Sequence, residues 1–178
     1  MGVTNAGSGP GDVALIVGGG PGISASCARH FTANGFKVAI AARSPEKPVL
    51  QTLRDTLGVA LFGCDASDPA AVAQLFDDVT RQIGRPTLVV HNIDGRVAGV
   101  FRKTVIELAP EMVRDTVTNA AFSAFLVGQQ AARVMVENPP DSNGVRGTFI
   151  ITNASAALKG FPASSAFAMA CQAKSGLA

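Results

Sequence analysis

A glycine cluster is the part of the sequence whose residue types and spacing point most directly to chemistry. The segment GGGPGIS, residues 18–24, follows an apolar run and precedes a segment of helical period. Glycines in such a turn let backbone N–H groups approach a pyrophosphate, whose charge the N-terminus of the next helix stabilises. The alternative is a flexible turn without a ligand, but the strand-turn-helix context favours a dinucleotide site.

Arg43, at the end of the next apolar run, is the second candidate binding residue. In dinucleotide-binding folds an acidic residue at this place accepts the ribose 2′-hydroxyl, whereas an arginine accommodates a 2′-phosphate. The chain has Ala41-Ala42-Arg43 and no carboxylate here, so NADP(H) is favoured over NAD(H) as the cofactor. The alternative is a solvated arginine that precedes a helix.

The elements that must position these residues alternate between short apolar runs and segments of helical period. This alternation predicts β-α-β units and an α/β, doubly wound Rossmann-type parallel sheet of about five strands with helices on both faces. We expect strands at about 13–17, 37–42, 59–62, 87–91 and 148–152, and helices at about 22–34, 44–57, 68–84, 110–137 and 164–178. Ser44-Pro45 and Asp68-Pro69 predict the starts of the second and third helices. Residues 13–178 are predicted to form one domain after a flexible N-terminal arm, residues 1–12.

Composition excludes several classes of protein. The formal net charge is +2 and the basic residues are scattered, so no nucleic-acid partner is expected. No run of about 18 uncharged apolar residues predicts a membrane span, and the N-terminus lacks the pattern of a secretory signal, so we expect a cytoplasmic protein. The three cysteines are interpreted as reduced, buried thiols, and no metal site is expected.

Several motifs together resemble the short-chain dehydrogenase/reductase family, from about Val13 to the end. Gly18-x-x-x-Gly22-Ile23-Ser24 is similar to the family's glycine turn except at its last position, where the family has glycine. The resemblance implies an NADP(H)-dependent oxidoreductase that acts on a small carbonyl or alcohol substrate. It also implies an adenine contact after the third strand and a catalytic asparagine in the long helix. The expected cofactor-binding residues are Gly18, Gly20, Gly22, Ile23, Arg43, Asp65, Ala66 and Asn92.

The chain contains no tyrosine, although the family's catalytic pair is Tyr-x-x-x-Lys. Aligning the last helix with the family places Phe167 on the tyrosine and Cys171 on the lysine, and the catalytic serine position falls on Ala154 with Ser155 next to it. Phenylalanine has no proton to donate, and cysteine supplies no permanent positive charge. Loss of a general acid typically costs about 10²–10⁴-fold in rate. The candidate catalytic residues that remain are Asn119, Ser155 and Lys174.

Other ionisable groups near the expected site are candidates for replacing the lost pair. Lys174 lies one helical turn beyond Cys171, and the alternative for it is a solvated or oligomer-facing lysine. Asp94 and Arg96 follow the fourth strand, where a solvent-exposed loop pair is the simpler interpretation. His91 fits a hydrogen-bonded structural histidine better than a base, and Cys171 has no evident partner that would lower the pKa of its thiol.

The chain stops within the helix that carries Phe167, whereas the family continues with further strands. The fifth strand is therefore expected to be an uncovered edge, which favours association. We expect a homo-oligomer joined through the helices that begin at Pro110 and near Ser164, the pair that the family uses. Two classes of function remain: an NADP(H)-dependent oxidoreductase, or a repurposed protein. The repurposed protein would be a non-redox cyclase, isomerase or dehydratase, or an inactive module that binds a cofactor or partner.

Overall fold

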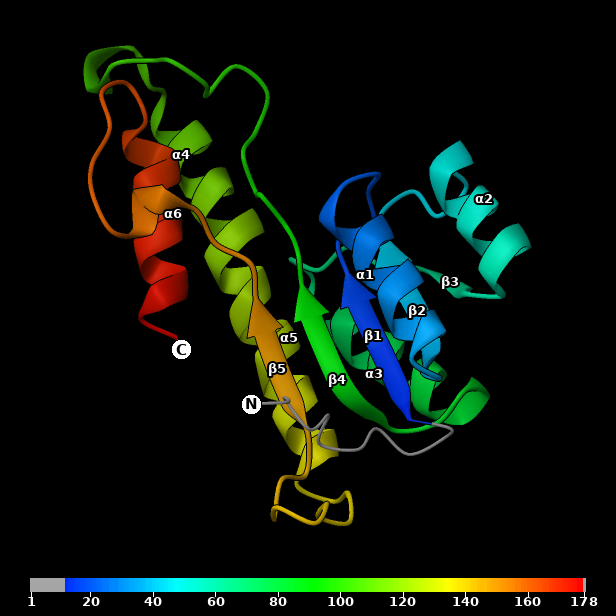
Figure 1. Cartoon of the computed structure of the whole chain (residues 1–178). Coiled ribbons are helices and arrows are strands. Elements are labelled where there is room, and N and C mark those ends of the chain that lie inside the picture. Colours follow the sequence, from blue (N-terminus) through cyan, green and yellow to red (C-terminus); the bar gives the residue numbers. More distant parts are fainter. Residues whose placement is uncertain (1–11, 178) are drawn as a thin grey trace, which may run out of the picture.

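Five parallel strands form one sheet in the computed structural model, which describes residues 12–177 (Figure 1). The strands are β1 (Val13–Val17), β2 (Lys37–Ala42), β3 (Ala60–Gly63), β4 (Pro86–His91) and β5 (Thr148–Ile151). Their order in the sheet is β3-β2-β1-β4-β5. The order reverses between β1 and β4, and open α/β sheets bind ligands at such a point. The predicted Rossmann-type fold is confirmed.

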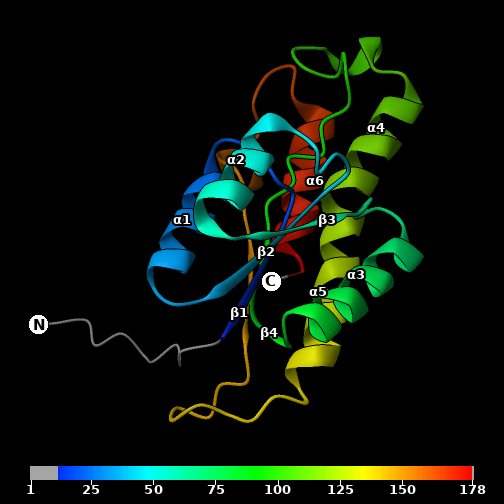
Figure 2. The same cartoon turned by 90° about the vertical axis from the view of Figure 1, so that its right-hand side faces the viewer.

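Helices cover both faces of the sheet, which Figure 2 shows from the side. They are α1 (Ile23–Ala33), α2 (Pro48–Leu57), α3 (Pro69–Gln82), α4 (Pro110–Val117), α5 (Ser123–Met135) and α6 (Ser165–Ser175). Successive strand residues point to opposite faces, so Ile16 and Ile40 pack with Leu50 of α2 on one face. Leu15 packs with Phe76 of α3 on the other, where α5 also lies. Both faces of the central strands are therefore buried.

The second helix begins later than predicted. Ser44-Pro45 does not start α2, whose first residue is Pro48. Lys47 has extended backbone angles, φ −54° and ψ 136°, because a residue that precedes proline is disfavoured in the helical conformation. The third helix begins as predicted, since the Asp68 side chain accepts a hydrogen bond from the Ala70 N–H at 2.9 Å and caps α3.

The long helix expected from residue 110 to 137 is interrupted. Between α4 and α5 the chain forms a π-helical segment, η2 (Thr118–Phe122), and α5 ends at Met135. The extra residue in a π-turn widens the helix locally, and such turns occur frequently at functional sites. Two short 3-10 helices, η1 (Val105–Glu107) and η3 (Ser155–Ala157), lie in the connections before α4 and before α6.

Helix α6 packs against α4, η2 and η3 rather than over the centre of the sheet. In Figure 1 it stands beside α4, beyond the carboxyl end of β5. Among the described residues β5 has a neighbour on one side only, in agreement with the expected edge strand. No described helix has both the length and the apolar character needed to cross a membrane. The predicted N-terminal arm lies outside the described residues except for Asp12.

Candidate functional site

A pocket of about 330 Å³ lies at the carboxyl ends of β1, β2, β3 and β4. Val17 pairs with Ala41 of β2 and with His91 of β4, so the chain leaves these three strands at the same level. The segments that follow the strands therefore converge on one crevice. The pocket is lined by Val17, Gly18, Gly19, Gly20, Ala41, Ala42, Arg43, Lys47, Cys64, Asp65, Ala66, Ser67, Asn92, Ile93, Asp94, Gly95, Arg96 and Asn119.

The glycine turn forms the floor of this pocket between β1 and α1. The Gly18 and Gly19 N–H groups donate to the Ala41 carbonyl at 2.9 and 3.1 Å, which fixes the turn against β2. Gly18 has φ +106°, and a Cβ there would lie 2.3 Å from the Asn92 carbonyl oxygen. Only glycine fits this position. At Gly20 a Cβ would meet no atom within 4 Å, so the backbone there is open to a ligand.

A chain of hydrogen bonds joins the turn to the ends of β4 and β5. The Ser24 hydroxyl donates to the Gly18 carbonyl at 2.6 Å, and the Asn92 side-chain amide donates to the Ser24 oxygen at 2.6 Å. The Thr152 hydroxyl donates to the side-chain amide oxygen of Asn92 at 2.9 Å. Ser24 replaces the glycine expected in the family's turn, and its hydroxyl contributes a bond that glycine cannot make. Asn92 thus positions the turn as well as lining the pocket.

The outer end of the pocket combines two cations with a carboxylate. Arg43 and Lys47 follow β2 in the chain and Asp65 follows β3, and all three line the pocket. The Asp65 carboxylate accepts bonds from the Ser67 hydroxyl at 2.7 Å and the Ser67 N–H at 3.0 Å. These bonds, with a smaller contribution from the charge of Arg43, lower the pKa of Asp65 below its ordinary value. Lys47 is a pocket residue that the sequence did not single out.

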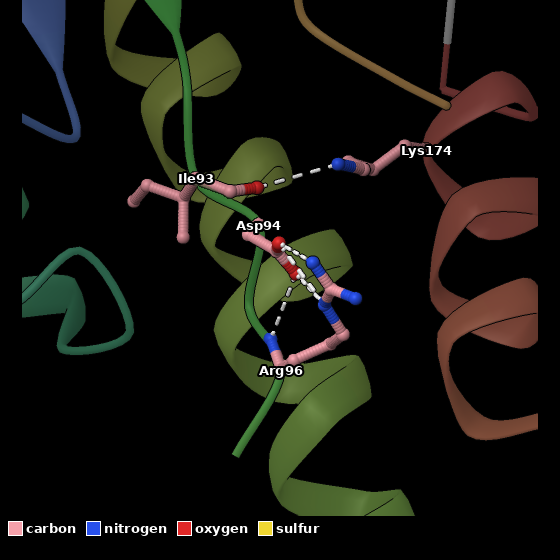
Figure 3. Close-up of polar contacts among 4 residues, drawn as sticks. All are labelled: Ile93, Asp94, Arg96 and Lys174. Carbon is pink, nitrogen blue, oxygen red and sulfur yellow. Dashed lines mark hydrogen bonds and ion pairs between the residues drawn. The ribbon is translucent and has the colours of Figure 1, made fainter. Parts of the chain in front are cut away.

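The inner end of the pocket is bounded by an ion pair between Asp94 and Arg96, drawn in Figure 3. Arg96 Nε donates to both carboxylate oxygens at 2.7 and 3.0 Å, and Nη2 donates to one of them at 2.5 Å. The guanidinium also lies over the rings of Phe167, 4.6 Å from the centroid, and Phe101, 5.3 Å away. Asp94 and Arg96, expected as a solvent-exposed loop pair, are indeed exposed, with side chains 49% and 35% accessible, but they also bind each other, and Arg96 stacks on an aromatic residue of α6.

Lys174 is buried, so the interpretation from the sequence as a solvated or oligomer-facing lysine was wrong. Its side chain is buried, with the residue 3% exposed. The ammonium donates to the carbonyls of Thr152 at 3.1 Å and Ile93 at 3.3 Å, the latter bond being visible in Figure 3. Burial lowers the pKa of Lys174 below its ordinary value, against the opposing effects of Cys171 and Asp94. Lys174 does not line the pocket.

His91 and the buried thiols have surroundings that favour structural roles. His91 is completely buried and its Nε2 lies 2.8 Å from the Ser123 hydroxyl, while its Nδ1 has no hydrogen-bond partner. Burial and the nearby charge of Lys174 lower the pKa of His91 to about 4, so the ring is neutral at pH 7. Burial raises the pKa of the Cys171 thiol, and burial with nearby carboxylates raises that of Cys64 to about 11. Neither thiol is activated as a nucleophile.

The structure brings most of the expected binding residues to the pocket and leaves several others outside it. Those that line it are Gly18, Gly20, Arg43, Asp65, Ala66, Asn92 and Asn119, the last from η2. Those that do not line it are Gly22, Ile23, Ser155 and Lys174. Gly22 is instead the N-cap of α1, and Ser155 is exposed at the start of η3. The pocket residues that sequence reasoning missed, such as Lys47 and Ser67, lie within a few residues of the recognised ones.

The fold and the glycine turn are those of a Rossmann-type α/β protein. Residues 18–178 match the family described as Enoyl-(Acyl carrier protein) reductase. The chain belongs to the short-chain dehydrogenase/reductase family of oxidoreductases. It is 28% identical over 162 residues to L-2,3-butanediol dehydrogenase of Corynebacterium glutamicum, which covers 87% of this chain and 58% of that protein. It is 32% identical over 127 residues to the 3-oxoacyl-(acyl-carrier-protein) reductase MabA of Mycobacterium tuberculosis, covering 70% of this chain and 45% of the reductase.

Solved structures share the fold. ElxO with NADP bound has a TM-score of 0.79 and 20% identity, with 93% of this chain and 64% of that one covered. An enoyl-(acyl-carrier-protein) reductase from Anaplasma phagocytophilum in complex with NAD has a TM-score of 0.79 and 19% identity, with 94% and 62% covered. The chain thus spans less than two thirds of the length of these proteins.

Proposed function

We propose that this chain binds NADP(H) in the pocket at the carboxyl end of the sheet. The observation that carries the proposal is the meeting of the open glycine turn with Arg43 and Lys47 in one pocket, with no carboxylate at the end of β2. A guanidinium can grip a phosphate through two parallel N–H bonds, and a second cation adds to the attraction. A carboxylate in that place would instead favour a free ribose hydroxyl.

The residues present fit the adenosine and pyrophosphate parts of such a cofactor. Arg43 and Lys47 would hold the 2′-phosphate, and Asp65 with Ala66 would border the adenine. The pyrophosphate would lie on the glycine turn, because α1 has no acidic residue in its first turn and no side chain that caps it. When bound, the cofactor would supply a hydride. The neighbour ElxO has been solved with NADP, and another neighbour with NAD, so the preference for NADP(H) rests on Arg43 and Lys47.

By family resemblance the reaction is hydride transfer on a small carbonyl or alcohol. By this resemblance Phe167 occupies the position of the family's proton-donating tyrosine, and Cys171 occupies the position of its lysine. Phenylalanine carries no exchangeable proton. Asn119 in η2 lines the pocket and retains the position of the family's catalytic asparagine. In the absence of the acid, hydride transfer relies on positioning alone and on water as the proton source, and we expect it to be slow.

A second candidate function is a cofactor-binding protein whose chemistry is non-redox or absent. It is favoured by the composition of the pocket wall, to which neither α6 nor η3 contributes a residue. Phe167, Cys171 and Ser155 are all outside the pocket, so an acid or base at those positions would not face a ligand in it. Cyclisation, isomerisation, dehydration or simple binding of a partner are the activities in this class.

Variants of two arginines test the cofactor proposal. Arg43→Ala should weaken NADPH binding roughly tenfold, as expected for an exposed charge-assisted contact, and leave NADH binding unchanged. Arg54→Ala, which removes an exposed arginine of α2 outside the pocket, is the matched control and should change neither. Equal weakening of both cofactors by Arg43→Ala would contradict the proposed role of its side chain.

Turnover separates the two functions. NADPH oxidation is followed with a panel of aldehydes and ketones under saturating cofactor. Oxidation that depends on the carbonyl compound supports the oxidoreductase, whereas binding without oxidation supports the second candidate.

A further inference from the structure

The Asp94–Arg96 ion pair lies between the pocket and α6. Both residues line the pocket, and the guanidinium of Arg96 rests on the ring of Phe167 in α6. Asp94 also interacts electrostatically with Lys174 of the same helix. The pair therefore contacts both the pocket and α6. Figure 3 shows the pair and Lys174 of α6. We call this ion pair the Asp94–Arg96 partition.

Ion pairing and aromatic stacking hold the partition in place, although its side chains are 35% and 49% exposed. The carboxylate and guanidinium are joined through two donor atoms of Arg96, the geometry in which surface ion pairs are strongest. Stacking of the guanidinium on Phe167 and Phe101 adds cation–π attraction. Although burial alone would raise the pKa of Asp94, the bonds and charge of Arg96 keep it below the ordinary value. The carboxylate is therefore ionised, and the pair intact, across the neutral pH range.

The backbone between the two residues restricts their movement. Gly95 has φ +84°, and a Cβ built on it would lie 2.4 Å from the Cβ of Ala120 in η2. The loop is therefore pressed directly against the π-helical segment and has no room to shift toward it. The buried ammonium of Lys174 anchors the preceding carbonyl, that of Ile93. The partition is thus fixed from both sides.

The partition limits how much of a dinucleotide the pocket can hold. A cofactor with its 2′-phosphate at Arg43 and its pyrophosphate on the glycine turn would direct its second nucleoside toward Asp94 and Arg96. Both carboxylate oxygens already accept bonds from Arg96, so they are poorly placed to accept ribose hydroxyls. The volume of about 330 Å³ is near the lower limit of the roughly 300–1,000 Å³ typical of small-molecule pockets.

We propose that the Asp94–Arg96 partition restricts recognition to the adenosine half of the cofactor, so that the chain is a receptor for adenine nucleotides bearing a 2′-phosphate. This inference rests on the proposed NADP(H) site and adds to it that the nicotinamide half makes little contribution to binding. The site then selects its ligand by the adenine and the 2′-phosphate, and it does not place the nicotinamide ring for hydride transfer.

Isothermal titration of the full chain with NADPH and with adenosine 2′,5′-bisphosphate tests the proposal. The expected result is a pair of affinities that agree within about threefold, since the added nicotinamide half gains less than a kcal/mol of favourable contact. Binding of NADPH more than about tenfold tighter than the bisphosphate would overturn the proposal and leave the NADP(H) site intact. If neither ligand binds, the proposed function itself fails, and the inference fails with it.

A double variant tests the partition directly. Asp94→Ala with Arg96→Ala should tighten NADPH at least about tenfold and leave adenosine 2′,5′-bisphosphate unchanged, because the removed side chains open the inner end of the pocket. Arg114→Ala with Asp115→Ala removes an exposed ion pair of α4 outside the pocket and should alter neither affinity. An unchanged ratio of affinities in the Asp94/Arg96 variant would contradict the proposal. Circular dichroism checks that each variant is folded. If a variant is not folded, the ratio of the NADPH and adenosine 2′,5′-bisphosphate affinities of the wild-type chain decides for or against the proposal.

Discussion

Two glycines of the same turn should respond to alanine in opposite ways. At Gly18 the added Cβ would lie 2.3 Å from the Asn92 carbonyl oxygen and the backbone has φ +106°. Positive φ costs a residue with a Cβ about 1–2 kcal/mol, and forced overlap in a packed region costs a further 1–3 kcal/mol or so. Gly18→Ala should therefore lower the free energy of unfolding by about 2–5 kcal/mol. At Gly20 the Cβ meets no atom within 4 Å and the change should stay within about 0.5 kcal/mol.

Thermal and urea unfolding followed by circular dichroism measure these effects. For a chain of this length about 2–4 °C of Tm is lost per kcal/mol, so Gly18→Ala should lower Tm by roughly 5–20 °C. Gly20→Ala should keep the wild-type Tm and instead weaken NADPH binding, because its methyl group projects into the proposed pyrophosphate site. Gly160→Ala, which also meets no atom within 4 Å but lies outside the pocket, should change neither property. A wild-type Tm for Gly18→Ala, or equal losses of stability at Gly18 and Gly20, would refute this reasoning.

Three further predictions concern buried and exposed side chains. The pKa of His91 is about 4 in the folded chain and 6.5 ordinarily, so the unfolded chain binds more protons than the folded chain between these two pH values. The free energy of unfolding should therefore fall by roughly 3 kcal/mol as the pH drops from 7 to 4. Urea titrations should show that His91→Gln removes this loss and His30→Gln does not; a loss that persists in His91→Gln would exclude His91 as its source. Lys174→Met should lower the unfolding free energy by about 1–3 kcal/mol because two partly buried carbonyls lose a donor. The change of the exposed Lys159 to Met should stay within about 0.5 kcal/mol, and equal effects of the two variants would contradict the argument. Finally, we expect a homo-oligomer joined through α4, α5 and α6. Because Phe125 is 44% exposed, Phe125→Asp should shift the oligomer toward monomer. A single monomeric species of the wild-type chain in sedimentation at micromolar concentration would contradict this expectation.

The parts of the site carried by local motifs could be predicted from the sequence. The glycine turn, Arg43, Asp65 and Asn92 each follow an apolar strand directly, and parallel strands bring their carboxyl ends to one edge of the sheet. The burial of the central strands on both faces likewise follows from short, continuously apolar runs separated by amphipathic helices. These features depend on neighbours in the chain, which a single sequence displays.

The features that were missed depend on contacts between distant segments. The shared helical face of Cys171 and Lys174 could be read from their spacing, but the rotation of α6 relative to β4 could not. That rotation places the Lys174 ammonium on the Ile93 carbonyl instead of in the pocket. The Asp94–Arg96 ion pair spans Gly95, and the sequence did not indicate that this glycine has φ +84° and lies directly against Ala120 of η2. Nothing in the residue types of η2 distinguishes a π-turn from a continuous α-helix.

The proposed NADP(H) site is best tested by a fluorescence titration of the wild-type chain with NADPH and, separately, with NADH. NADPH should bind saturably at one site per chain and NADH should bind more weakly, because only NADPH offers a 2′-phosphate to Arg43 and Lys47. Failure of NADPH to bind, or binding of NADH as tight as that of NADPH, would contradict the proposed site.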